Sequence, residues 1–267
     1  MMEYAVALSS AQLRSTPAGA FSAFDRIYAG SEFCQNLLPD PAALASACKR
    51  LARPFTLLLP PVTDEFLPRA AALSGALTSA GYVDEIVVND PGLAGLLSVK
   101  VPRQKARLSA GRVLTVMMGH SAFSGIFFTV FGGRLEAIEA DSPDRLRMAQ
   151  GGASAPVNFH APLAYLSVTR YCHFKKGFNG PCKVPCGEKL RPVAYRGRPG
   201  GFYIRGNACL RDNREELKRG GGIDGLLAAF PAVKRLVLAA PGGAGFSRLM
   251  GVTDRRKLLE EAFGALQ

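Results

Sequence analysis

The sequence contains few of the residues and motifs that mark common catalytic sites. Only three histidines and six cysteines occur in 267 residues. There is no Walker phosphate-binding loop, no Gly-x-Ser-x-Gly nucleophile turn and no His-Glu-x-x-His helix. These absences argue against a P-loop nucleotidase, an α/β-hydrolase and a helical zinc peptidase.

Other absences concern the cellular environment and the domain organisation. Six cysteines are too few for a disulfide scaffold, and the first ten residues lack the basic segment and apolar core of a signal peptide. We therefore expect a cytoplasmic protein whose reduced cysteines bind metal or carry out redox chemistry. Because no repeat and no long linker occurs, we expect one domain over residues 1–267.

Acidic residues are outnumbered, with 21 Asp and Glu against 33 Lys and Arg, which gives a net charge of +12. Such a balance suits RNA, an anionic membrane surface or an acidic small molecule as a partner. No nucleic-acid module with interleaved aromatic residues accompanies the charge. Nucleic acid is therefore the less favoured of these partners.

One stretch without Lys, Arg, Asp or Glu, from Val113 to Gly133, is long enough to cross a bilayer. Glycine and serine residues interrupt it at 119–121 and 124–125. A buried strand followed by a buried helix produces the same pattern, and we favour that interpretation.

Short apolar runs alternate with helical patterns along the chain, which is typical of βα units and a parallel sheet. Eight such runs in a chain of this length predict a single (β/α)8 TIM-barrel-like domain of the α/β class, regular or irregular. The predicted strands are Glu3–Ala7, Asp25–Ala29, Pro54–Leu59, Glu85–Val88, Val113–Met117, Arg134–Ile138, Pro156–His160 and Lys234–Ala239.

Helix starts are indicated where an aspartate is followed by proline, since the carboxylate caps free amides and proline fits the first turn. This pattern predicts helices beginning at Asp40-Pro41, Asp90-Pro91 and Asp141-Ser142-Pro143. Cys48 falls on the apolar face of the first of these helices, so we interpret it as a small core residue. The last helix is expected from about Thr253 to Leu266.

Three cysteines lie in one Gly/Pro-rich segment with the spacing Cys172-x9-Cys182-x3-Cys186. Clustered thiols in a loop are typical of metal ligands, and thiolate favours iron–sulfur clusters or zinc. The spacing fits zinc poorly, because zinc sites more often use Cys-x2-Cys pairs. A [4Fe–4S] cluster takes four protein ligands, or three with an open iron, and Cys34 or Cys209 is the candidate for the fourth.

Chemistry in a (β/α)8 barrel takes place at the carboxyl ends of the strands. Cys34 follows the second predicted strand, His120 follows the fifth, and His160 closes the seventh. The two histidines are candidate catalytic residues, either as proton carriers or as ligands, with a satisfied barrel residue as the alternative for each.

Several segments resemble the U-32 family, which was first described as collagenase-like peptidases. The resemblance runs from Tyr28 to about Ala240. Its specific parts are the cysteine segment Asn179–Cys186 and the run His160-Ala161-Pro162-Leu163-Ala164-Tyr165. Looser matches are Tyr28–Cys34, Gly119-His120 and Tyr203–Asn207. The chain is most similar to members of this family that act in ubiquinone biosynthesis without oxygen.

The resemblance implies a barrel fold and a [4Fe–4S] cluster held by Cys34, Cys172, Cys182 and Cys186, with Cys209 as a spare thiol or a substitute ligand. It also implies oxygen-independent hydroxylation of a quinone precursor, which a lipid-carrier protein could present. The partner would be a second U-32 protein in a heterodimer, with prephenate as the oxygen source.

Other functions stay open at this stage. Some U-32 relatives hydroxylate tRNA or rRNA, and the basic charge fits that activity. A non-catalytic electron-transfer subunit would have the same cysteines. Protease activity is disfavoured, because cysteines that hold a metal are not available as nucleophiles.

Overall fold

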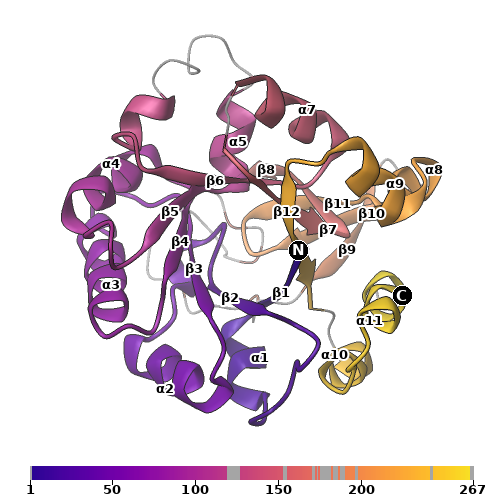
Figure 1. Ribbon diagram of the computed structural model, residues 1–267, viewed down its shortest axis with the longest axis horizontal. Helices are drawn as coiled ribbons and strands as arrows, with labels where there is room; N and C mark the ends of the chain where they lie inside the picture. Colours follow the sequence, from indigo (N-terminus) through magenta and orange to yellow (C-terminus); the bar gives the residue numbers. More distant parts are fainter. Residues whose placement is uncertain are drawn as a thin grey trace.

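The computed structural model describes residues 2–118, 127–152, 155–169, 172, 174, 182, 186, 190–195, 198–240 and 243–264. Eight parallel strands close into a barrel in the order β1-β12-β7-β6-β5-β4-β3-β2, and helices surround it (Figure 1). The predicted (β/α)8 barrel of the α/β class is therefore confirmed.

The barrel strands are β1 Glu3–Leu8, β2 Arg26–Gly30, β3 Phe55–Leu59, β4 Glu85–Val88, β5 Arg107–Ala110, β6 Leu135–Ala140, β7 Val157–Ala161 and β12 Val233–Ala239. The helices in the described part of the chain are α1 Ser10–Ser15, η1 Gln35–Leu37, α2 Pro41–Leu51, α3 Leu67–Ser79, α4 Pro91–Lys100, α5 Arg112–Met118, α7 Pro143–Gly152, α8 Arg214–Arg219, α9 Gly222–Ala229, α10 Gly243–Met250 and α11 Arg255–Gly264. Seven of the eight predicted strands overlap a barrel strand.

The prediction of the fifth strand was wrong, because the run from Val113 to Met117 lies in helix α5 and the strand is β5 before it. Asn89 explains the early helix start, since its Oδ1 accepts the Val113 N–H at 2.9 Å. Gly111 makes room for this amide, because a Cβ at Gly111 would lie 2.2 Å from that oxygen. The polar positions Arg107 and Ser109 hid β5 in the sequence.

The predicted helix starts are confirmed. The carboxylate of Asp40 accepts the Ala43 N–H at 2.9 Å, and that of Asp90 accepts the Leu93 N–H at 2.8 Å. Helix α7 begins at Pro143, and the last helix is described from Arg255 to Gly264. Cys48 is buried on α2, as its spacing indicated.

The uncharged run covers α5 from Val113 to Met118, residues 119–126 outside the described part, and the segment 127–133. Among the helices that the structure describes, none combines the length and apolar character needed to span a bilayer.

The main apolar core lies between the outer face of the barrel strands and the helices. The inside of the barrel is different, because its apolar cluster consists only of a few residues at mid-height. Above and below them, alternate strand positions hold buried polar and charged side chains. Those below 6% exposure are Arg26, Thr56, Glu85, Ser109, Glu139, Asn158, His160 and Arg235.

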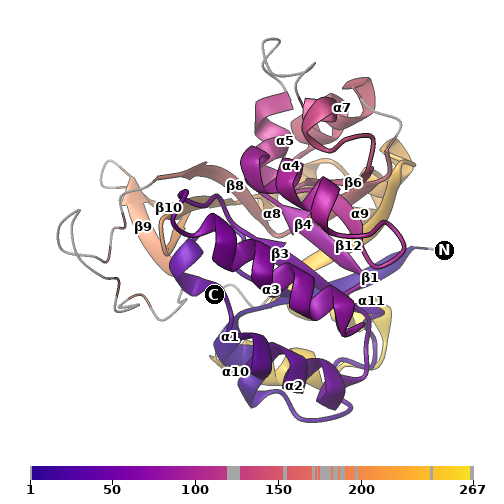
Figure 2. The same ribbon diagram turned by 90° about the vertical axis from the view of Figure 1, so that its left-hand side faces the viewer.

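A second sheet is inserted between β7 and the helices α8 and α9, which lead to β12. Its strands are β8 Leu163–Val168, β9 Arg191–Tyr195, β10 Arg198–Arg205 and β11 Ala208–Asp212, all antiparallel, in the order β8-β11-β10-β9. In side view, this sheet projects from the end of the barrel opposite the N-terminus (Figure 2). It therefore stands over the carboxyl ends of the barrel strands.

Candidate active site at the barrel mouth

Cys34 occupies a tight turn directly after β2. Gly30 leaves the strand with φ +124°, and a Cβ there would lie 2.4 Å from the Leu58 carbonyl oxygen. The Ser31 hydroxyl then donates to the Cys34 carbonyl at 2.7 Å and accepts the Cys34 N–H at 3.2 Å. The backbone N–H of Asn36 donates to the Cys34 sulfur. Local backbone chemistry therefore fixes this buried thiol at the barrel mouth.

The three loop cysteines, Cys172, Cys182 and Cys186, belong to the segment between β8 and β9. Burial raises the pKa of Cys34, and the negative charges of all three loop cysteines raise it further. Each loop thiol therefore lies near enough to Cys34 for the two charges to interact. The six cysteines form no disulfide. Within the described residues, no group of three His, Cys, Asp or Glu side chains is arranged to hold a metal ion.

Two cavities meet at Cys34. The outer cavity, of about 380 Å³, lies between Cys34 and Cys172 and is also lined by Asn89, Met117 and Asn207. The barrel-mouth cavity, of about 70 Å³, is also lined by Cys34 and reaches His160. Its remaining lining includes Glu32, Arg112, Arg205 and the apolar residues Leu8, Phe33, Leu37, Leu58, Leu163 and Leu210.

His160, at the floor of the barrel-mouth cavity, is paired with Glu139. Its Nε2 lies 2.5 Å from Glu139 Oε2, and both side chains are nine-tenths or more buried. The other carboxyl oxygen, Oε1, accepts a hydrogen bond from Asn158 at 2.8 Å and one from the Tyr28 hydroxyl at 3.3 Å. The pair is thus held from below by two neutral donors.

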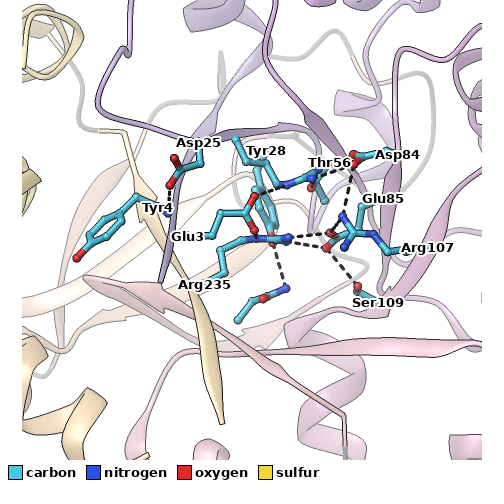
Figure 3. Close-up of polar contacts among 12 residues, drawn as sticks. Glu3, Tyr4, Asp25, Tyr28, Thr56, Asp84, Glu85, Arg107, Ser109 and Arg235 are labelled. Atoms are coloured by element: carbon cyan, nitrogen blue, oxygen red, sulfur yellow. Dashed lines mark hydrogen bonds and ion pairs between the residues drawn. The ribbon is translucent and has the colours of Figure 1, made fainter. Parts of the chain in front are cut away.

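The hydrogen bonds continue down the barrel from Tyr28. Arg235 donates to the Tyr28 hydroxyl at 2.6 Å and forms two bonds to Glu85, at 2.8 and 3.0 Å. Figure 3 shows its guanidinium reaching between Glu85 and Glu3, the latter at 2.6 Å. Glu3 also accepts from Arg26 at 2.9 Å. A polar column therefore links the mouth of the barrel to its opposite end.

Glu139 and His160, the buried pair at the top of this column, have pKa values that favour their neutral forms. Burial and the charge of Glu85 raise the pKa of Glu139 to about 8. Burial and the charge of Arg112 lower the pKa of His160 to about 3. A low-dielectric site disfavours the charged form of each group. At neutral pH, a protonated Glu139 therefore faces a neutral imidazole.

A second charged cluster forms the wall of the cavity. Arg112 bonds both carboxylate oxygens of Glu32, at 2.7 and 2.5 Å, and donates to Asp141 at 3.2 Å. It also donates to the Leu163 carbonyl at 2.8 Å, and Asp141 accepts from Arg145 as well. Two cations and two carboxylates balance each other, so this cluster fastens β8 and the β2 turn to the barrel.

The structure thus brings together some of the residues chosen from the sequence. Cys34 and His160 line one cavity, and Cys34 and Cys172 line another. His120 lies outside the described residues, and the segment before it is helix α5, which corrects its predicted place at a strand end. Cys209 lies on β11, in register with Ile204 and Ser167.

Sequence reasoning missed the charged partners inside the barrel, namely Glu32, Glu85, Arg112, Glu139, Asp141 and Arg235. No sequence signal marked them: in the strand Leu135–Ala140, Glu136 and Glu139 are three positions apart and lie on opposite faces, so the sequence alone does not show which of them points into the barrel. A charged face inside a barrel buried on both sides marks polar interior chemistry rather than a solvated surface.

The fold defines the chain as a (β/α)8 barrel protein with an antiparallel sheet inserted after the seventh barrel strand. No family model matches the chain, and no curated protein matches it. Among solved structures, it is similar to a type I 3-dehydroquinate dehydratase from Clostridium difficile, with 8% identity, coverage of 59% of this chain and 74% of that chain, and a TM-score of 0.39. It is also similar to a β-1,3-glucanosyltransferase from Rhizomucor miehei, with 10% identity, coverage of 90% and 88%, and a TM-score of 0.49. Neither likeness bears on activity.

Proposed function

We propose that the chain binds a [4Fe–4S] cluster through Cys34, Cys172, Cys182 and Cys186 and acts as the iron–sulfur subunit of an oxygen-independent hydroxylase of ubiquinone biosynthesis, resembling UbiV. The observation that carries the proposal is the position of Cys34. This thiol comes from a distant part of the sequence, yet it lies at the barrel mouth within the electrostatic reach of all three loop cysteines.

The donor set fits such a cluster. Four thiols are the ligands that a [4Fe–4S] cluster takes from proteins, and backbone N–H groups that donate to the sulfurs tune its potential. Asn36 supplies one such N–H to Cys34. A cluster keeps its ligand sulfurs further apart than a single ion does, since an iron atom stands at each ligated corner. The outer cavity, at about 380 Å³, is lined by two of these cysteines, Cys34 and Cys172.

The cluster, when bound, would supply electrons or activate an oxygen donor such as prephenate. Side chains of the protein itself bind the substrate, exclude water and position Cys34. Leu58, Leu163 and Leu210 exclude water from the barrel-mouth cavity and bind a ring. The Arg112–Glu32 ion pair fixes the turn that carries Cys34 next to that ring.

The proposed partners follow from the same resemblance. A UbiU-like U-32 protein would form a heterodimer with this chain, and a lipid-carrier protein could present the quinone precursor. The net charge of +12 would favour an anionic membrane surface or an acidic carrier.

The direct test of this function is deletion of the gene from its host. Quinone made without oxygen should disappear, whereas quinone made with oxygen should remain. A plasmid copy with Cys48→Ala should restore production, because Cys48 is a core residue of α2, and a copy with Cys34→Ala should not. Unchanged anaerobic quinone in the deletion strain would refute the proposal.

The second candidate is an RNA hydroxylase of the U-32 type, favoured by the excess of basic residues. Phosphate contacts make RNA affinity fall steeply with salt concentration. Micromolar tRNA binding that weakens with salt, together with normal anaerobic quinone in the deletion strain, would favour this second function.

A further inference from the structure

The free edge of the His160 ring faces the barrel-mouth cavity. Nε2 is occupied by Glu139, and among the described residues Nδ1 has no hydrogen-bond partner. His160 is 5% exposed and lines the cavity, so Nδ1 points to the space where a ligand would lie. A polar atom of a buried residue that is directed into a cavity without a partner indicates a missing ligand atom.

The hydrogen bonds around Glu139 assign the protons. Oε1 accepts from Asn158 and Tyr28, so it acts as the carbonyl-like oxygen. Tyr28 keeps its proton because burial raises its pKa well above the usual value. Oε2 therefore carries the acid proton and donates it to Nε2 of His160. A neutral imidazole that accepts at Nε2 holds its own proton at Nδ1, directed into the cavity.

We propose that Glu139 and His160 form a proton-donating pair for the hydroxyl or carbonyl oxygen of a small ring bound in the barrel-mouth cavity. The inference rests on the proposed function, because it names the ligand class of the same site. The cavity of about 70 Å³ is about half of the roughly 150 Å³ that encloses a benzene ring, so it holds the oxygen-bearing edge of the ring while the rest of the ring extends toward the open mouth.

The step balances without an outside reagent. The ligand arrives with its oxygen as a phenolate or develops enolate charge there. As that oxygen takes the Nδ1 proton, the Nδ1–H bond breaks and an O–H bond forms. The Glu139 proton moves to Nε2, so the imidazole stays neutral, and the negative charge passes from the ligand to the Glu139 carboxylate. Asn158 and Tyr28 already donate to that carboxylate and stabilise its charge.

Every neighbouring element contributes to the field at His160. Glu32 and Arg112 face it from the β2 turn and from α5, and Asp141 from the end of β6. Arg235 reaches it from β12, and the ring of Tyr28 on β2 lies 5.7 Å away in an edge-on contact. Arg235 and Tyr28 act on the ligand only through Glu139, so they are positioning residues.

The first test is nitrogen NMR of ¹⁵N-histidine-labelled protein purified without oxygen. His160 should be the Nδ1–H tautomer and neutral at pH 7, and phenol at millimolar concentration should shift its Nδ1 signal. This measurement on the unaltered chain requires no variant. An imidazolium or an Nε2–H tautomer at pH 7, or no response to phenol, would overturn the proposal.

The second test is Glu139→Gln, which keeps a donor toward His160 and an acceptor for Asn158 but has no acid proton. The tautomer and the phenol affinity should stay within about threefold of the parent, whereas anaerobic hydroxylation should fall by about 100-fold or more. Glu136→Gln changes a carboxylate of the same strand that is paired with Arg103 and should have no effect. Full activity in Glu139→Gln would contradict a donor role.

Iron and sulfide measured on the same samples separate the two proposals. The expected tautomer and phenol response in a protein without iron would refute the cluster and retain the ring site. Four irons with the wrong tautomer would refute the proton-donating pair and retain the cluster.

Discussion

Glu139 and His160, on the neighbouring strands β6 and β7, share a 2.5 Å hydrogen bond inside the barrel. Glu139 is in register with Asn158, so the histidine lies one inward position further along its strand. Parallel pairing with a side-chain period of two thus places both side chains on the inner face of the barrel, within hydrogen-bonding distance of each other. Burial leaves both neutral, so the shared bond is one between two uncharged groups.

The neutral acid should make stability depend on pH. The pKa of Glu139 is raised from 4.5 to about 8, so its contribution is fully present below about pH 4.5 and is lost as the pH rises through 8. The pKa of His160 is lowered from 6.5 to about 3, so its contribution is present above 6.5 and is lost as the pH falls toward 3. Since one pKa unit is worth about 1.4 kcal/mol, Glu139 carries a few kcal/mol at most.

Glu139→Gln removes the pH dependence of stability that comes from Glu139 and keeps the one that comes from His160. Between pH 5 and 9, we expect the free energy of unfolding of the variant to fall by about 2–4 kcal/mol less than that of the parent. Urea denaturation of both proteins at pH 5, 7 and 9 measures this difference in the free energy of unfolding. Parallel profiles for the two proteins would mean that Glu139 is ionised in the native state at neutral pH.

The Arg112 cluster should be sensitive to the loss of its cation. Arg112→Met would leave Glu32 and Asp141 buried with less compensating charge, which typically costs about 3–5 kcal/mol. Arg147→Met is the matched control, because Arg147 pairs with Asp144 at the surface, where the expected loss is below about 1 kcal/mol. Equal denaturation midpoints for the two variants would contradict a fastening role for Arg112.

The turn that presents Cys34 should not tolerate a side chain at Gly30. The φ of +124° and the 2.4 Å that would separate an added Cβ from the Leu58 carbonyl oxygen predict a loss of roughly 2–4 kcal/mol for Gly30→Ala. Gly75→Ala lies inside helix α3 with open space around it, so it should stabilise by about 0.5–1 kcal/mol. A neutral Gly30→Ala in thermal unfolding would show that the turn can relax.

The barrel was predictable because parallel strands buried on their outer face stand out as apolar runs. Strands such as Glu85–Val88 were found with their full bounds. β5 was missed because two of its four residues are polar and the apolar run that follows it is helical. Local hydrophobicity does not distinguish a buried strand from a buried helix. The tertiary hydrogen bond between Asn89 and Val113 does, because it fixes the start of the helix.

The site was predictable only in part. Cys34 and His160 were found because thiols and imidazoles are rare in this chain and were expected at strand ends. Their partners Glu139 and Arg112 were not found, since a single carboxylate or guanidinium in a strand or helix has no distinctive sequence signal. Only the closure of the barrel, which brings β2, β6 and α5 around one cavity, identifies them.

The central claim is the cluster on four cysteines, and iron and acid-labile sulfide in anaerobically purified protein test it most directly. We expect about four of each per chain, with the visible absorption of a [4Fe–4S] cluster. Both should be lost in Cys34→Ala and retained in Cys209→Ala and in the core control Cys48→Ala. Zinc in place of iron, no metal at all, or loss of iron in Cys209→Ala with retention in Cys34→Ala would contradict the proposed ligand set.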